Sequence, residues 1–320
     1  MAGWCSGLAL AMCALTACGG EPSFVAPTGP LPGALSELGV GFGEEPPAPL
    51  ARYAPRWPLW SSGSDKDRLY YLPAPIDTSA PDRWQLPRGT MLFKTFSYEL
   101  GPDTHRPVET RVLRLLDTGW EYSVYLWAAD GSDAHLIDLG ASVVVELVDD
   151  RGVAFEHRVP SRLDCRTCHE SARAPVLGFS ELQLDDATLA ELDAAGLRSV
   201  PSPSPERIDH PDSATRDVLG LFQGNCVHCH HGGAGASASF DLRHDVALAN
   251  VIDVPTMSSA SAAGIRVVPG DPGSSILFLA LSGETDDPAI KPMPPLGVDR
   301  RDTEGIELVR DWIESLASEP

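Results

Sequence analysis

The sequence predicts an α+β protein of several domains, in which an N-terminal antiparallel β domain is followed by a mainly helical region. Apolar and polar residues alternate in short segments between residues 91 and 157, which is typical of strands. Gly- and Asp-rich turns separate these segments. Apolar residues recur at helical spacing in residues 213–223 and 302–316. With 320 residues, of which 43% are hydrophobic, the chain is long enough to bury more than one core.

The N-terminus predicts export. Residues 8–17 form an apolar run that is too short to span a bilayer, and it ends in LTAC at residues 15–18. This ending resembles a bacterial lipobox, whose Cys is lipidated and becomes the first residue. We therefore expect a lipoprotein signal peptide over residues 1–17 and a lipid anchor at Cys18, on the periplasmic face of the outer membrane or at the cell surface. No Lys or Arg precedes Arg52, so an ordinary cleaved signal stays the alternative.

Residues 18–52 are rich in Pro and Gly and contain few aromatic residues. Such a composition is typical of a tether rather than a core. We expect at most one local turn, over residues 35–42, to dock on the rest of the chain.

Residues 53–160 predict the antiparallel β domain. In residues 120–126 every second residue is apolar, which predicts a strand buried on one face. Similar patterns cover residues 91–98, 109–116, 142–148 and 153–157. We expect a small sandwich or a curled sheet. We assign it a structural or partner-docking role, because it contains no nucleophile triad and no phosphate loop.

The remaining chain predicts two helical parts. Residues 161–211 contain a short helix, with Asp185 as its N-cap and Gly196 as its end, followed by a Pro-rich linker or loop. Residues 212–320 contain the helix at 213–223, a turn that starts a helix near residue 275, and a last helix with Asp302 as a candidate N-cap.

Two copies of the pattern C-x-x-C-H lie in these helical parts, at residues 165–169 and 226–230. In an exported protein this pattern is typical of c-type haem attachment. Two thiols on one helical turn add to the two vinyl groups on one edge of a porphyrin, and the adjacent His gives iron an imidazole ligand. We therefore predict two covalent haem c groups. Their residues are Cys165, Cys168 and His169, and Cys226, Cys229 and His230, the two histidines being the metal ligands.

Other readings of the four thiols stay open. Two C-x-x-C pairs are also the donor set of a structural zinc site, and one pair is also the pattern of a redox dithiol. Neither alternative requires the His that follows both pairs. The chain has seven Cys, of which Cys5 and Cys13 lie in the predicted signal peptide and Cys18 is the predicted lipid site. The haem interpretation therefore leaves no thiol over for a disulfide.

A far-side iron ligand is predicted for the second haem alone. Met293 lies in a Pro-rich segment late in the chain, where restricted backbone angles would hold its thioether in place. Met and His ligation together raise the reduction potential of haem iron. Met257 is the competing candidate. For the first haem the candidates are His157 and His210, and an open site is the alternative.

The order of these features resembles a family of exported diheme c-type cytochromes from Gram-negative bacteria. Besides the lipobox, the β domain and the two motifs, the shared features are PSR at 160–162, GNC at 224–226, DLR at 241–243, VPGDP at 268–272, MPP at 293–295 and WI at 312–313. The resemblance extends from about residue 35 to the C-terminus. It implies a class I cytochrome c-like domain over residues 212–320, in which the first and last helices cross beside the haem. It also implies electron transfer through both haems, without naming a donor or an acceptor.

We therefore expect an electron carrier rather than an enzyme, which passes single electrons between redox partner proteins. A diheme peroxidase with an open first haem, and an electron-transfer subunit of an exported dehydrogenase, are the alternatives. The formal net charge of −21 excludes a nucleic-acid partner and suits partners with basic surfaces, although it also serves solubility.

Overall fold

The computed structural model describes residues 23–80, 83–102, 104–233, 240–256 and 263–318. The predicted signal peptide, Cys18 and Met257 lie outside the described residues. Within these ranges, no helix combines the length and the apolar character needed to cross a membrane.

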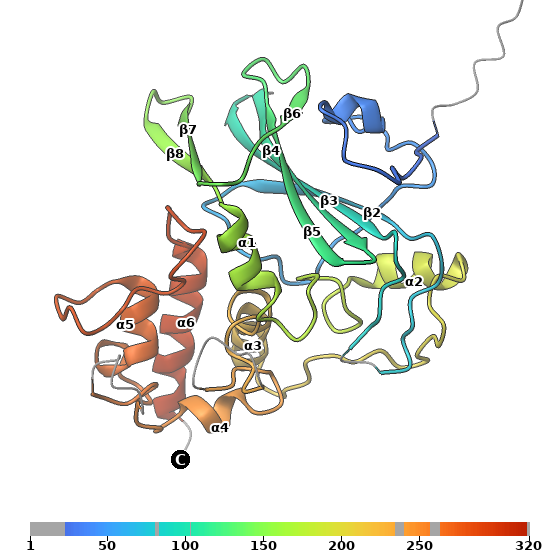
Figure 1. The fold of residues 1–320 in the computed structure, drawn as a ribbon. Coiled ribbons are helices and arrows are strands. Elements are labelled where there is room, and N and C mark those ends of the chain that lie inside the picture. Colours follow the sequence, from blue (N-terminus) through green and yellow to red (C-terminus); the bar gives the residue numbers. More distant parts are fainter. Residues whose placement is uncertain (1–22, 81–82, 103, 234–239, 257–262, 319–320) are drawn as a thin grey trace, which may run out of the picture.

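Six antiparallel strands form one sheet in which the strands follow one another in sequence order (Figure 1). They are β1 (Ala51–Arg52), β2 (Asp65–Tyr71), β3 (Met91–Gly101), β4 (Thr104–Leu116), β5 (Gly119–Trp127) and β6 (Ala134–Leu136). A separate hairpin joins β7 (Val143–Val148) to β8 (Ala154–Val159). The strands predicted from the alternating pattern are confirmed, and the architecture is α+β. The arrangement is a single meander with an added hairpin, rather than two sheets of a sandwich.

One face of the sheet is covered by the segment that precedes it. The side chains of Phe24, Leu35 and Leu50 pack against Phe93 and Tyr125 of the sheet. Leu35 begins η1 (Leu35–Leu38), a short 3-10 helix. The prediction of a tether over residues 18–52 is therefore wrong from residue 23 onward, although the docking turn near residue 35 is confirmed. A few apolar anchors suffice to hold this Pro-rich segment against an apolar sheet face.

The same covering segment overturns the prediction that β5 is buried on one face only. Val124 is 1% exposed and Tyr125 is 0% exposed, although neighbouring side chains of a strand point to opposite faces. Both faces of the strand are therefore inside the protein.

The other face of the sheet packs against the segment that contains the first motif. Here α1 (Arg162–His169) and α2 (Asp186–Ala194) contribute Cys165 and Leu189 to one core with Tyr70, Leu92 and Tyr122 of the sheet. The predicted N-cap of α2 is confirmed, because the Asp185 side chain accepts a hydrogen bond from the Thr188 N–H. Residues 161–199 therefore share their core with the sheet instead of forming a separate unit.

The C-terminal part is helical and has its own core. Its elements are α3 (Ser213–Asn225), α4 (Ala247–Val251), η2 (Pro272–Ser274), α5 (Ile276–Ser282), α6 (Thr303–Ser315) and η3 (Leu316–Ser318). The helices α3 and α6 pack together: the rings of Phe222 and Trp312 meet edge-on at 6.3 Å, and Trp312 Nε1–H donates to Thr215 Oγ1 at 3.1 Å. The helices predicted at 213–223 and 302–316 are confirmed, with Asp302 as the N-cap of α6.

A short segment after β1 joins the sheet to the helical core. Trp57 crosses α3 so closely that a Cβ on Gly224 would lie 2.6 Å from the Trp57 carbonyl oxygen. The Trp60 N–H donates to Asn225 Oδ1 at 2.7 Å, and its indole N–H donates to the Arg300 carbonyl at 2.7 Å. Gly224 is required here because no other residue lets the two backbones approach so closely.

Candidate functional site

The fold brings the two C-x-x-C-H motifs into contact. The first motif forms the end of α1, which stands between the sheet and α3 in Figure 1, and the second begins where α3 ends. The thiols of Cys168 and Cys229 act on each other, and this interaction raises the pKa of Cys168 and lowers the pKa of Cys229. All four motif cysteines are free thiols in the structure. Two motifs that are distant in sequence are therefore neighbours at their second cysteines.

A hydrogen bond also links the residues that follow the two motifs. His231, which directly follows the second motif, is 3% exposed, and its Nε2–H donates to the Ser171 carbonyl at 2.7 Å. Ser171 lies two residues beyond the first motif. Sequence reasoning missed His231, because only the fold shows that the residue after one motif reaches the residue after the other.

The histidine of the first motif is a neutral imidazole that uses one of its two nitrogens in a hydrogen bond. Its Nδ1–H donates to the Pro175 carbonyl at 2.5 Å, which leaves Nε2 with a free lone pair. Metal-bound histidines commonly use their second nitrogen in this way, since the hydrogen bond fixes the tautomer and the ring orientation. Burial lowers the pKa of His169 to about 3, because the hydrogen bond to Pro175 only partly opposes it and the charges of Lys94 and Arg111 add to it. The imidazole is therefore uncharged at neutral pH.

A tyrosine of the sheet lies beside this histidine. The rings of Tyr122 and His169 are 5.4 Å apart at an angle of 44°. Among the described residues the Tyr122 hydroxyl is buried without a hydrogen-bond partner, and burial raises its pKa to about 12. Because buried hydroxyls are normally hydrogen-bonded, this unpaired hydroxyl is available to bind a further polar group beside His169.

The second motif also leaves a buried polar atom unpaired. His230 Nδ1 is buried and has no hydrogen-bond partner within the described ranges. Burial lowers the pKa of His230, and the Phe240 ring lies 4.4 Å from the imidazole ring. The backbone carbonyl of His230 accepts from the Leu242 N–H at 2.9 Å, which holds this part of the chain in place.

These donor sets fit haem c at both motifs. Each motif presents two free thiols and a histidine, and each histidine keeps a nitrogen that is not used by the protein's own hydrogen bonds. No three His, Cys, Asp or Glu side chains in the described ranges converge as a metal-binding group.

The candidate far-side ligands differ in their surroundings. His157 uses both ring nitrogens, because Nδ1 accepts from the Tyr98 hydroxyl at 2.9 Å and Nε2–H donates to Glu109 at 2.8 Å. It therefore has no nitrogen left for iron. His210 Nδ1 accepts from the Asp212 N–H at 3.2 Å at the start of α3. Met293 is 39% exposed, and its backbone N–H donates to the Ala280 carbonyl of α5 at 2.9 Å. Neither observation tests the predicted role of Met293 as a far-side ligand, which stays a prediction.

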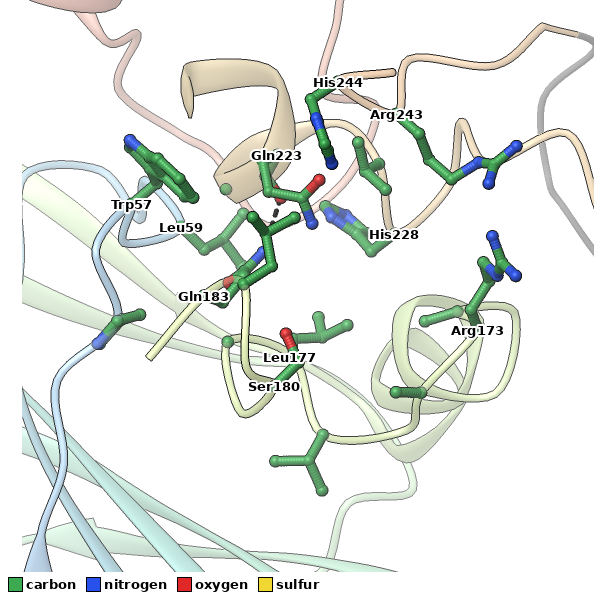
Figure 2. Close-up of a pocket in the computed structure, with 18 of the residues that line it drawn as sticks. Trp57, Leu59, Arg173, Leu177, Ser180, Gln183, Gln223, His228, Arg243 and His244 are labelled. Carbon is green, nitrogen blue, oxygen red and sulfur yellow. Dashed lines mark hydrogen bonds between the residues drawn. The ribbon is translucent and has the colours of Figure 1, made fainter. Parts of the chain in front are cut away.

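A cavity of about 190 Å³ lies between the two motif segments (Figure 2). Its walls include Leu177, which follows the first motif, and His228, which lies within the second. The Gln183 side-chain amide donates to the Gln223 carbonyl at 2.8 Å and closes one side, as the dashed line in Figure 2 marks. Arg173 and Arg243 both lie at the right of this view. The cavity therefore adjoins both motifs.

Comparisons with protein-family models, with curated proteins and with solved structures found no match to this chain. The functional assignment therefore starts from the geometry of the two motifs.

Proposed function

We propose that the protein is an exported diheme c-type cytochrome, which carries single electrons between redox partner proteins through two covalently attached haems. The observation that carries the proposal is the contact between the two C-x-x-C-H motifs, at Cys168 with Cys229 and at His231 with Ser171. A carrier with two haems needs them close together, and these contacts bring their attachment points side by side.

The residues of the chain have distinct parts in this function. Each thiol adds across one vinyl group, with sulfur bonding one carbon and the proton going to the other, so that no atom is lost. His169 and His230 are the proximal ligands, and Met293 is the proposed far-side ligand of the second haem. The haems supply the redox chemistry, while the protein sets the potentials through ligands, burial and hydrogen bonds. We also propose Cys18 as the membrane anchor through which the carrier stays near its partners.

The test is the number of haems on the mature protein. The chain is expressed in a bacterial host with working haem-attachment machinery, and haem is counted from the reduced absorption spectrum and the intact mass. We expect two haems in the unaltered chain and one haem in each double variant, Cys165→Ala with Cys168→Ala and Cys226→Ala with Cys229→Ala.

Colourless protein from a host whose own c-type cytochromes are coloured would refute the proposal. If the same material also carried a Cys168–Cys229 disulfide, a redox dithiol protein would be the better assignment. A host that lacks the attachment machinery is the matched control, and we expect colourless protein from it.

A further inference from the structure

Three arginines are buried among the described residues, and one of them has no acid beside it. Arg114 pairs with Glu121 at 2.7 Å. Arg198 pairs with Glu181 at 2.9 Å. Arg266 is 7% exposed, and within the same residues no carboxylate acts on its charge. A buried charge without an opposite charge is costly, so this exception needs a physical reason.

The Arg266 guanidinium contacts neutral groups instead. Its Nη1–H donates to the Asn250 carbonyl in the last turn of α4 at 2.7 Å. Its central carbon lies 4.4 Å from the centre of the Phe240 ring. One carbonyl acceptor and one cation–π contact offset only part of the cost of burying the charge, and burial lowers the pKa of Arg266. An arginine nevertheless stays charged at any pH at which the protein is folded.

The backbone holds Arg266 from two sides. Its N–H donates to the Val254 carbonyl at 2.8 Å, and its carbonyl accepts from the Leu277 N–H of α5 at 3.0 Å. The residue therefore lies between the segment that follows α4 and the start of α5. Because the far end of the side chain is also bonded to Asn250, the charge is fixed in its buried place.

The ring beside the Arg266 guanidinium also contacts the second motif. The centre of the Phe240 ring lies 4.4 Å from that of the His230 imidazole. Burial is the main cause of the lowered pKa of His230, and the charges of His228 and Arg266 add to it. The cation without an acid is therefore a neighbour of the proposed proximal ligand of the second haem.

We propose that Arg266 raises the reduction potential of the haem attached at Cys226 and Cys229, by holding a permanent positive charge beside the ligand His230. This inference rests on the proposed function, since it concerns one of the two haems of the carrier. Ferric iron carries one more positive charge than ferrous iron, so a nearby cation opposes the ferric state. An acid paired with Arg266 would cancel this effect, which gives the missing acid a physical reason.

The experiment uses Arg266→Gln in the haem-loaded full chain. Glutamine keeps an amide donor and removes the charge. Haem content is measured by intact mass, and both reduction potentials are measured by spectroelectrochemistry. We expect two haems, with the reduction of one of them weakened about tenfold, which is 59 mV for one electron. The same shift is expected when Cys165→Ala and Cys168→Ala remove the first haem, which assigns it to the second.

Arg310→Gln is the matched control. Arg310 also lies over an aromatic ring of the helical core, at 4.7 Å from the centre of Phe278. Its side chain is 37% exposed and pairs with Glu284 at 2.6 Å. The control variant loses the same charge from the surface, so we expect both potentials to stay unchanged. Arg266→Lys keeps the charge, and we expect its potentials to stay close to those of the unaltered chain.

Burial gives the charge a second signature. Salt screens exposed charges strongly and buried charges much less. The difference in potential between Arg266→Gln and the unaltered chain should therefore be the same at low and at high ionic strength. A difference that disappears in high salt would contradict the inference, because it would belong to an exposed charge.

Further outcomes would overturn the inference. Two haems with unchanged potentials in Arg266→Gln would leave Arg266 a structural role at the end of α4 and leave the proposed function intact. Equal falls of both potentials would indicate a general loss of packing instead of a charge beside His230. If Arg266→Gln carries one haem, Arg266→Met is measured in the same way, and one haem in both variants would assign Arg266 to folding alone. Colourless unaltered protein would reject both the inference and the proposed function.

Discussion

The carboxylate of Glu109 allows a quantitative test of the buried polar network beside the first motif. Burial acts to raise the pKa of Glu109, but the Arg111 charge and the hydrogen bonds from His157 and Arg111 outweigh it, and the pKa falls from 4.5 to about 2. A pKa that is lower in the folded state stabilises the fold above the unfolded value and is lost as the pH falls toward the folded value. At about 1.4 kcal/mol per unit, this shift corresponds to about 3 kcal/mol at pH 7.

The perturbation is Glu109→Gln, which removes the charge and leaves Arg111 buried without an acid. We expect unfolding in urea at pH 7 to show a loss of about 3–5 kcal/mol, as for other buried pairs that lose one partner. Because the unaltered chain loses about 2 kcal/mol of this contribution by pH 3, the gap between the two proteins narrows by that amount. Tryptophan fluorescence follows the transition at both pH values.

The matched control is Glu146→Gln, since Glu146 is exposed on β7. Exposed substitutions of this kind change stability by about 0.5 kcal/mol or less. A difference between Glu109→Gln and the unaltered chain that is the same at pH 7 and pH 3 would show that the carboxylate charge does not stabilise the fold as argued.

Two further predictions concern the contact between the domains and the second haem. In Gly224→Ala the new methyl group meets the Trp57 backbone, and this overlap costs about 1–3 kcal/mol, which outweighs the gain of about 1 kcal/mol in helix propensity. Thermal unfolding of this variant should therefore show a lower Tm. The control is Asp217→Ala on the exposed side of α3, which should not lower the Tm. Met293→Ala should lower the reduction potential of one haem, because Met ligation raises it. If Met257→Ala has this effect and Met293→Ala does not, the ligand assignment is wrong.

The elements that the sequence predicted are those whose signals are local. The helix after Asp185 and the helix after Asp302 follow from an N-cap and an apolar stripe, and both are present. The strands β3, β4 and β5 follow from alternation within each segment.

The strand β2 was missed because its inward side is charged. Its sequence, DKDRLYY, places Lys66 and Arg68 on the face that packs toward the first motif, so alternation gave no apolar signal there. The covering role of residues 23–50 was missed for a related reason. Its anchors are too widely spaced in a Pro-rich segment to form a pattern, and only the apolar face they meet explains their burial.

The candidate site was predicted in its residues but not in its arrangement. The spacing within each motif indicates two thiols and a histidine for one ligand. Nothing in the spacing indicates that Cys168 would meet Cys229, or that His231 would reach Ser171, because these contacts depend on how α1 is placed against the end of α3.

If the protein is the proposed cytochrome, the contact between Cys168 and Cys229 also implies an order of events during biogenesis. Neighbouring thiols in an oxidising compartment are readily converted to a disulfide, and that bond would remove one attachment point from each motif. In that case haem would have to be joined to the newly exported chain before α1 docks beside α3. Once both thioethers existed, folding would proceed without competition from oxidation, because neither thiol would be left to form a disulfide.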